Sequence, residues 1–421
     1  MMALESWLTK FKSAAVVNLP DFLHRKAKVS ILAFEIAGLM SKILHLWRSL
    51  SDASLVRLRN ETITLPGVRK LVSDDDAFLL ALACAELTDG LRSAVASISA
   101  LCWRCTDQSL RQFGCLFKEF GDSGGDPHRW VMTWKEMDAK AKKMDGYVAS
   151  AAALYKEMDE LAEAERGLGK VLGAEGPQQL IVWKRREVKY LKQSSLWSSS
   201  FDSAISLLVR SSFTILARIK QVFGIPQIIP YNSSFISATV HPETPPPATT
   251  PGSIITTSTA ALTPPPTTVG AASLAPHYAK LVVVVERMMQ APRARADVRD
   301  EMYGMMTARL RAMVRARLIG VGRGPPRDSG LASEWRAAMR EIMEWLGPVA
   351  HGTLRWHGER SYERRSAGAV VRENVFVLQT LYFANMEKVE AAIVELLVGI
   401  NYVWRFEMEL SGKYLKQDYE L

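Results

Sequence analysis

A segment rich in proline and threonine, residues 225–269, most constrains how this chain can fold. It holds 10 of the 19 prolines, 10 threonines and 5 serines, and Glu243 is its single charged residue. Proline donates no backbone hydrogen bond, and the segment has little apolar surface to bury, so we expect a disordered linker. The predicted organisation is an N-terminal extension, a first domain, the linker, a second domain and a tail: residues 1–29, 30–224, 225–269, 270–410 and 411–421.

The composition on either side of the linker is that of folded protein. Hydrophobic residues make up 48% of the 421 residues and charged residues 23%, which excludes a wholly disordered chain. The formal net charge of +9 fits an acidic partner or an anionic surface without requiring either.

The first domain has apolar residues at helical spacing throughout. Ser73 precedes three aspartates, a pattern that predicts a helix start because the hydroxyl accepts a backbone N–H and acids favour the positive helix end. The expected helices before residue 121 are 31–50, 74–103 and 107–120, and a loop follows over 121–127.

The longest predicted element begins near Trp130. Apolar residues alternate in steps of four and three from there to Ala162, the spacing of a coiled-coil-like helix. A glycine-rich turn ends it, and a second long helix is predicted over 178–223 with the same spacing from Phe201 to Val222. We expect the two helices to fold back on each other as an antiparallel hairpin.

The second domain also has helical spacing, and no stretch alternates with the period of two that indicates a strand. Its expected helices are 272–290, 296–318, 331–347 and 373–404. The predicted fold class is therefore all-α: a helical bundle with a long antiparallel coiled-coil-like hairpin, then a second helical domain after the disordered Pro/Thr-rich linker.

The cysteines lie close together in the sequence and are Cys84, Cys102, Cys105 and Cys115. The CxxC spacing of the middle pair suits zinc, but a structural zinc site needs four ligands, and the other two lie isolated in predicted helices. We expect buried, reduced thiols, no metal site and a reducing compartment.

The sequence contains none of the common catalytic motifs. It has no HExxH, GxSxG or P-loop, and the glycine-rich run 320–324 follows a helix and precedes prolines, which indicates a loop. His351 and His357 are six residues apart, so one helical face does not hold both, and we expect them to cap or pack a helix. No catalytic, cofactor-binding or metal-binding residue, no cofactor and no small-molecule substrate is predicted, and we expect a protein that is not an enzyme.

Basic residues cluster in three places: Lys140/Lys142/Lys143, Lys184-Arg185-Arg186 and Arg309/Arg311/Arg315/Arg317. A solvated basic face is the usual meaning, and an acidic partner or nuclear import is the alternative. Most of the 11 tryptophans are expected in the core, although exposed ones could stack on nucleic-acid bases. The helix of the third cluster also carries Met302, Met306, Leu310 and Met313, which predict a core face rather than a membrane-surface helix.

No signal peptide or membrane-spanning segment is predicted, and no glycine follows the first methionine to accept a myristoyl group. Thr244-Pro245, Thr250-Pro251 and Thr263-Pro264 are minimal proline-directed phosphorylation sites in the linker. We expect the protein in nucleus and cytoplasm, and less so at the plasma membrane.

Several motifs resemble the plant PSK-simulator family, in the same order along the chain. They are ILAFEIA (31–37), LWRSLSD (46–52), VRKLVSDD (68–75), EVKYLK (187–192), ARIKQVFG (217–224), LAPHYA (274–279), EWLGPVAH (344–351), LQTLYFA (378–384) and ELLVGINYVWRF (395–406). The resemblance covers most of residues 30–224 and 270–410. It departs from the family at Pro276, which delays a helix start, and in lacking the myristoylation signal with which longer relatives begin.

The resemblance implies two domains of unknown function and a role in growth promotion and in peptide-hormone or defence-elicited signalling. It supplies no catalytic motif. We therefore expect a non-enzymatic regulatory or scaffold protein whose partners are signalling components. The alternative is a nuclear, nucleic-acid-associated protein that uses its basic helices.

Overall fold

The computed structural model describes residues 29–168, 175–224, 260–290, 296–320, 328–363 and 375–417. These residues are helical and contain no strand, apart from an isolated bridge between Thr268 and Asn385, so the all-α class is confirmed. Residues 1–28 of the predicted N-terminal extension and residues 225–259 of the predicted linker lie outside the described residues. The elements of the first half are η1 (Ser30–Leu32), α2 (Ala33–Ser49), α3 (Asp52–Arg57), η2 (Leu58–Thr62), α4 (Pro66–Leu71), α5 (Asp76–Cys102), α6 (Gln108–Arg111), α7 (Phe113–Ser123), α8 (Trp134–Leu168), α9 (Glu175–Ser194), η3 (Leu196–Ser198) and α10 (Phe201–Val222).

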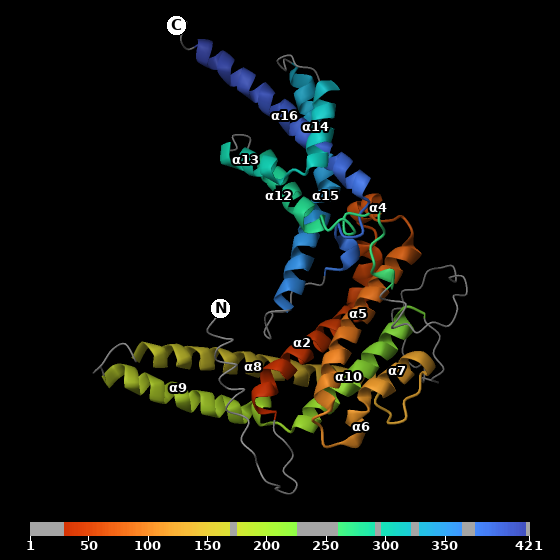
Figure 1. Ribbon diagram of the computed structural model, residues 1–421, viewed down its shortest axis with the longest axis vertical. Coiled ribbons are helices and arrows are strands. Elements are labelled where there is room, and N and C mark those ends of the chain that lie inside the picture. Colours follow the sequence, from red (N-terminus) through yellow and green to blue (C-terminus); the bar gives the residue numbers. More distant parts are fainter. Residues whose placement is uncertain are drawn as a thin grey trace.

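The core of the first half forms where α2, α5 and α10 pack together. Helix α5 starts two residues later than predicted, because the carboxylate of Asp75 rather than Ser73 accepts the backbone N–H of Ala77, at 2.9 Å. Ser73 instead accepts the N–H of Asp75, at 3.1 Å, and so holds the capping residue in place. Figure 1 shows α5 and α10 lying along α2, with the short α6 and α7 on the outer side.

The predicted hairpin is present, and it consists of α8 and α9. Along α8 the predicted seam is buried from Met137 to Ala151, where it packs on α2. Farther along, Tyr155 is exposed on one side while its ring contacts Phe34 of α2, with ring centroids 5.6 Å apart, and beyond it the hairpin leaves the bundle (Figure 1). We call this projecting part, α8 beyond Leu154 together with α9, the arm.

The prediction of a single long helix over 178–223 is wrong. It breaks after Ser194, and α10 starts at Phe201 in a different direction. Serines cause the break, because their hydroxyls compete for backbone groups. The Ser195 hydroxyl accepts the N–H of Trp197 at 3.4 Å, and the Ser198 hydroxyl donates to the carbonyl of Lys192 at 2.6 Å.

The second half packs α12 and α15 against each other, with α16 across them. Its elements are α12 (Ala275–Gln290), α13 (Ala296–Met305), α14 (Ala308–Gly320), α15 (Ser329–Glu363), η4 (Val377–Gln379) and α16 (Met386–Gln417). Helix α12 begins at Ala275 with Pro276 in its first turn, where a proline costs no hydrogen bond.

Three helix predictions in this half are corrected. The helix predicted over 296–318 is broken at Thr307, whose hydroxyl accepts the N–H of Leu310 at 3.3 Å and starts α14. The helix predicted to end at residue 347 continues through Pro348. The helix predicted from residue 373 starts only at Met386, as α16, where the side chain of Asn385 accepts the N–H of Lys388 at 3.1 Å. It continues into the predicted tail.

The two halves share an interface, which we call the joint. Phe376, Val377 and Leu378 belong to the core of the first half, and Leu71 belongs to the core of the second. Helix α4 approaches α15 so closely that a Cβ on Gly67 would lie 2.1 Å from the carbonyl oxygen of Trp345.

Polar bonds fix the joint from both sides. The Glu86 carboxylate accepts the indole N–H of Trp356 at 2.7 Å and the backbone N–H of Val377 at 2.6 Å. The backbone N–H of Asn385 donates to the carbonyl of Leu71 at 2.8 Å. The division into two independently folding domains stays a prediction, and the joint adds that the two are packed together.

The last ten residues of the predicted linker are ordered against the second half. Val269 is buried, and its backbone N–H donates to the carbonyl of Ala384 at 2.9 Å. Within the described chain, the ordered second half therefore begins earlier than the predicted residue 270.

Candidate partner-binding surface

Cys84 and Cys105 have the properties of protonated thiols rather than of nucleophiles. Burial raises the pKa of Cys84 to about 11. A hydrogen bond with Cys102, together with burial, raises the pKa of Cys105. A thiol with a raised pKa is a poor nucleophile at neutral pH. The prediction of buried thiols fits Cys102 and Cys105, but Cys115 is exposed.

Histidine and carboxylate side chains are dispersed over the molecule. Among the residues that the structure describes, no three His, Cys, Asp or Glu side chains gather in a way that could hold a metal ion. His351 pairs with Glu286, with 2.7 Å between Nε2 and Oε2, and so links α15 to α12. His357 is exposed, and neither histidine caps a helix end, because α15 runs on to Glu363.

Two arginines of the α14 cluster are held by acids of α16. Arg309 Nε lies 2.7 Å from Glu390 Oε2, and Arg317 Nε lies 2.8 Å from Glu395 Oε1. Glu390 is fully buried and also accepts the hydroxyl of Tyr278, at 2.8 Å. Burial, together with the bond to Glu390, raises the pKa of that tyrosine to about 12. Met306 and Leu310 are buried beside this network, so the predicted core role is confirmed.

The second basic cluster is divided between the inside and the outside of the arm. Lys184 Nζ lies 2.5 Å from Glu160 Oε2 and 3.2 Å from Glu157 Oε2, across the hairpin. Arg185 pairs with Glu165 at 2.8 Å. The bond with Lys184 lowers the pKa of Glu160, and the bond with Glu160 raises the pKa of Lys184. These pairs hold α9 onto α8.

The opposite face of α9 carries large side chains that touch solvent. Trp183 is 55% exposed and Tyr190 is 64% exposed. Together with Arg186 they stand at i, i+3 and i+7, which places them on one side of the helix. Lys189 is exposed beside them. Ile181 and Val188 are buried, because they face α8.

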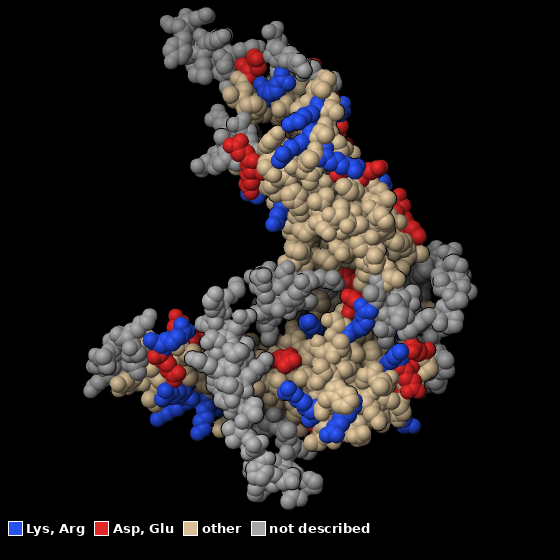
Figure 2. All heavy atoms as spheres, in the orientation of Figure 1, with Lys and Arg blue, Asp and Glu red and all other residues tan. Residues whose placement is uncertain are grey.

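This face combines exposed aromatic rings with two cations, Arg186 and Lys189, that can pair with an acidic partner. Within the described part of the chain, neither Arg186 nor Lys189 is among the ion-paired residues. Figure 2 shows Lys and Arg side chains gathered along the α9 edge of the arm. Exposed aromatic residues with arginine are the residue types that dominate protein interfaces, so the face is suited to a protein partner of acidic character.

The sequence analysis assigned most tryptophans to the core, and it did not single out the arm. Trp130 is buried and Trp134 stacks on Trp47, with ring centroids 5.5 Å apart, as expected. Trp183 is the exception within the hairpin. The signal was available in the sequence, because Trp183 and Tyr190 both adjoin basic residues, in WKRR and KY.

The lysines of α8 separate by helical position. Lys140, which is half-buried, and Lys143, which is exposed, line a cavity between α8 and α10, whereas the exposed Lys142 does not. The three basic clusters of the sequence thus lie on three different helices, α8, α9 and α14.

One described helix, Ser30–Ser49, is long and apolar enough to cross a membrane by length and composition alone. In this structure its residues pack against α5, α8 and α10, and Ile36, Met40 and Ile43 are fully buried. A core helix of this kind passes the same test as a membrane span.

Two family models match parts of the chain. A domain of unknown function, DUF3475, matches residues 31–87, and a protein of unknown function, DUF668, matches residues 268–355. The first match covers α2 to the middle of α5, and the second begins at the ordered end of the predicted linker. No solved structure matches the chain.

Three curated proteins of Arabidopsis thaliana are similar to the chain over most of its length. Protein PSK SIMULATOR 1 is 24% identical over 89% of the chain, and Protein PSK SIMULATOR 2 is 24% identical over 90%. Protein PSK SIMULATOR 3 is 23% identical over 89%. The matched region is 56%, 60% and 56% of these relatives, so the chain spans little more than half of their length. The resemblance predicted from the sequence motifs is confirmed.

Proposed function

We propose, from the kinship of this chain with the PSK SIMULATOR proteins, that it is a non-enzymatic regulator of growth signalling. The name of these relatives connects them to PSK, the peptide hormone phytosulfokine. The role that we infer for this chain is that of a scaffold, which holds a protein partner against the arm and places it relative to the two packed halves.

The outer face of α9 is the observation that carries this proposal. A soluble helix that is not a binding surface normally turns polar side chains outward. Here Trp183, Arg186 and Tyr190 point outward on a hairpin that projects from the bundle. The ion pairs of Lys184 and Arg185 with α8 hold the helix in this orientation, so the exposed face is not a consequence of a loose helix.

The charge distribution favours a protein partner over nucleic acid. Tight binding to a phosphate backbone needs many unpaired cations, because each neutralised phosphate adds to the affinity. In the described residues, Arg309 and Arg317 of α14 are paired with glutamates of α16, and the arm also uses Lys184 and Arg185 internally. The few cations left on the arm suit an acidic patch on a protein.

The absence of a catalytic role is part of the same proposal. Cys84 and Cys105 have raised pKa values, and the ion pair of His351 with Glu286 connects two helices. We further propose that the protein works in the nucleus and the cytoplasm, where the thiols stay reduced.

Proximity labelling in plant cells tests the scaffold role and the arm together. The full chain, fused to a biotin ligase, is compared with Trp183→Ala/Arg186→Glu/Tyr190→Ala, which we call the arm variant. We expect one signalling protein with an acidic surface to be labelled by the wild-type chain and its labelling to fall at least about tenfold with the arm variant.

Trp103→Ala is the matched control, because Trp103 is 75% exposed on the first half, away from the arm. It should label the same partner as the wild-type chain. Equal labelling by the arm variant and the wild-type chain would contradict the role of the arm. A labelled set dominated by nucleic-acid-bound proteins, lost at high salt, would favour the alternative function instead.

A further inference from the structure

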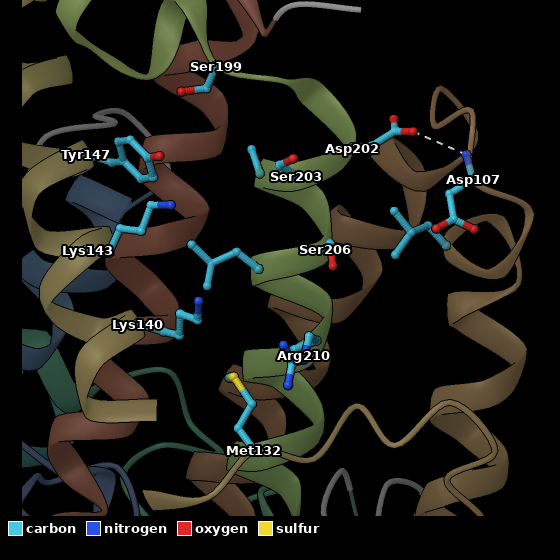
Figure 3. Close-up of a pocket in the computed structure, with 13 residues that line it drawn as sticks. Asp107, Met132, Lys140, Lys143, Tyr147, Ser199, Asp202, Ser203, Ser206 and Arg210 are labelled. Atoms are coloured by element: carbon cyan, nitrogen blue, oxygen red, sulfur yellow. Dashed lines mark hydrogen bonds between the residues drawn. The ribbon is translucent and has the colours of Figure 1, made fainter. Parts of the chain in front are cut away.

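A cavity of about 480 Å³ lies between α8 and α10 and is bordered by α6. Its volume is in the range of pockets that hold small molecules. Figure 3 shows Lys140, Lys143 and Tyr147 on the α8 side, and Ser203, Ser206 and Arg210 on the α10 side.

The polar side chains of the cavity form two stripes with equal spacing. On α8 they stand at 140, 143 and 147, and on α10 at 203, 206 and 210, which is i, i+3 and i+7 in both helices. The helices run in opposite directions in Figure 3, so Tyr147 lies toward Ser203 and Lys140 lies toward Arg210. Two cations from one helix and one from the other therefore border the same space.

The two carboxylates of the lining are engaged elsewhere. Asp202 accepts the backbone N–H groups of Thr106, at 3.1 Å, and of Asp107, at 3.2 Å. Asp107 accepts the backbone N–H and the hydroxyl of Ser109, at 2.9 and 2.7 Å, and these bonds lower its pKa. Figure 3 shows the Asp202 carboxylate turned toward Asp107 rather than toward the lysines.

The three cations are thus not neutralised by the acids that line the cavity with them. Among the described residues, no carboxylate lies within ion-pair distance of Lys140, Lys143 or Arg210. Lys143 Nζ lies 5.5 Å from the centroid of the Tyr147 ring, a contact that orients the ammonium group without neutralising it. Glu136 is attracted to Arg210 and Lys140, but its carboxylate accepts the N–H and the hydroxyl of Thr133, both at 2.9 Å.

We propose that this cavity binds a small molecule that carries phosphate. Ammonium and guanidinium groups donate the charge-assisted hydrogen bonds that phosphate oxygens accept most strongly. The hydroxyls of Tyr147, Ser203 and Ser206 supply further donors at the same site. Such a ligand would join α8, which continues into the arm, to α10 in the core of the first half.

The proposal goes beyond the scaffold role and does not depend on it. It uses the face of α8 that is turned toward α10, whereas the proposed partner surface is the outer face of α9. Either can therefore fail while the other stands.

Calorimetric titration of the full chain with pyrophosphate, and separately with orthophosphate, tests the proposal. We expect saturable binding of one pyrophosphate per chain. Lys140→Gln/Lys143→Gln should weaken the binding of pyrophosphate at least about tenfold, because two charge-assisted contacts from α8 are removed. Arg210→Gln should also weaken it, because it removes the contact from α10. Stronger binding of pyrophosphate than of orthophosphate would assign the site to ligands with two linked phosphates. Equal binding of the two would assign it to ligands with a single phosphate group.

Lys135→Gln/Lys142→Gln is the matched control. It removes the same charge from α8 at two exposed positions outside the cavity lining. The affinity of this control for pyrophosphate should stay within about twofold of that of the wild-type chain. Melting curves without ligand show that the variants fold, and only the wild-type and control chains should gain stability from pyrophosphate. No saturable binding by the wild-type chain, or equal weakening by both double variants, would overturn the proposal.

Discussion

Helices α9 and α10 follow each other in the chain and were predicted as one helix, yet they have opposite surroundings. In α9, Ile181 and Val188 are buried on the side that packs mainly on α8, and Trp183 and Tyr190 touch solvent. In α10, residues 211–220 are buried on every side, because α2, α5 and α7 surround the helix. The comparison shows that a repeated apolar spacing identifies the face that must be buried but not how many neighbours will cover the other faces.

The charged residues of α10 show how far this burial goes. Lys220 is buried and donates to the carbonyls of Phe120 and Gly121, both at 2.9 Å, at the C-terminal end of α7. Arg218 is buried too and pairs with Asp52 at 2.5 Å. In α9 the corresponding charges either pair with α8 or face solvent.

The largest expected difference between the two helices is in the free energy of unfolding, and Leu208→Asp in α10 should reveal it. Leu208 is fully buried in the core of the first half, so the variant places an unpaired charge among apolar side chains. We expect it to lose about 4 kcal/mol or more of the free energy of unfolding. Leu180→Asp is the matched change on α9, where Leu180 is 48% exposed, and it should cost less than about 0.5 kcal/mol. Denaturant unfolding measures both, and equal losses would show that the arm is as closely packed as the bundle.

Lys220→Met should have an intermediate effect. It keeps the length of the side chain but removes the donor, so the buried carbonyl of Gly121 loses this partner, whereas the carbonyl of Phe120 keeps the backbone N–H of Gly124 at 3.1 Å. We expect a loss of about 2 kcal/mol in the free energy of unfolding. Lys189→Met on the exposed face of α9 should change it by less than about 0.5 kcal/mol, and a stable Lys220→Met protein would mean that the buried ammonium group is not needed.

The same lysine predicts a pH dependence. Burial lowers the pKa of Lys220 below its usual 10.5. Between the folded pKa and 10.5 the unfolded chain binds more protons than the folded chain, so this group makes stability rise with pH in that window. The difference in unfolding free energy between wild-type and Lys220→Met should therefore grow from neutral pH toward 10.5. A difference that stays constant or shrinks would contradict the lowered pKa.

The smallest effect is expected for the ion pairs of the arm. The folded pKa of Glu160 is lowered, so the stability that this group contributes is present above 4.5 and is lost as the pH falls through the folded pKa. The folded pKa of Lys184 is raised, so its contribution is present below 10.5 and is lost as the pH rises through the folded value. Amide hydrogen exchange, corrected for its intrinsic pH dependence, should show less protection in α9 on acidification and little change in α10. Equal changes in the two helices would contradict this.

The sequence predicted the helical content, the hairpin and the buried face of α10 correctly, because apolar spacing is a local property. It did not reveal the break after Ser194 or the one at Thr307, since serine and threonine are tolerated in helices and act as caps only where tertiary packing redirects the chain. The joint at Glu86 and Val377 connects residues almost 300 positions apart, and no local pattern indicates such a contact.

The candidate sites were predictable only in part. The sequence identified the lysines of α8 and the WKRR cluster of α9 as basic, but which charges are paired depends on α8, α10 and α16 in three dimensions. Lys140 and Lys143 line the cavity with residues of α10 and Lys142 does not, a difference that depends on where α10 lies, and the single helix predicted over 178–223 did not give that position.

The central claim is that the outer face of α9 acts on a partner while α10 holds the fold. It is tested most directly by measuring growth and protein stability with the same arm variant. Seedlings that overexpress the wild-type chain should grow larger than plants without it, and seedlings that overexpress Trp183→Ala/Arg186→Glu/Tyr190→Ala to the same level should not. The purified arm variant should melt within about 2 °C of the wild-type chain, because its three positions are exposed. Growth promotion by the arm variant equal to that of the wild-type chain would contradict the account.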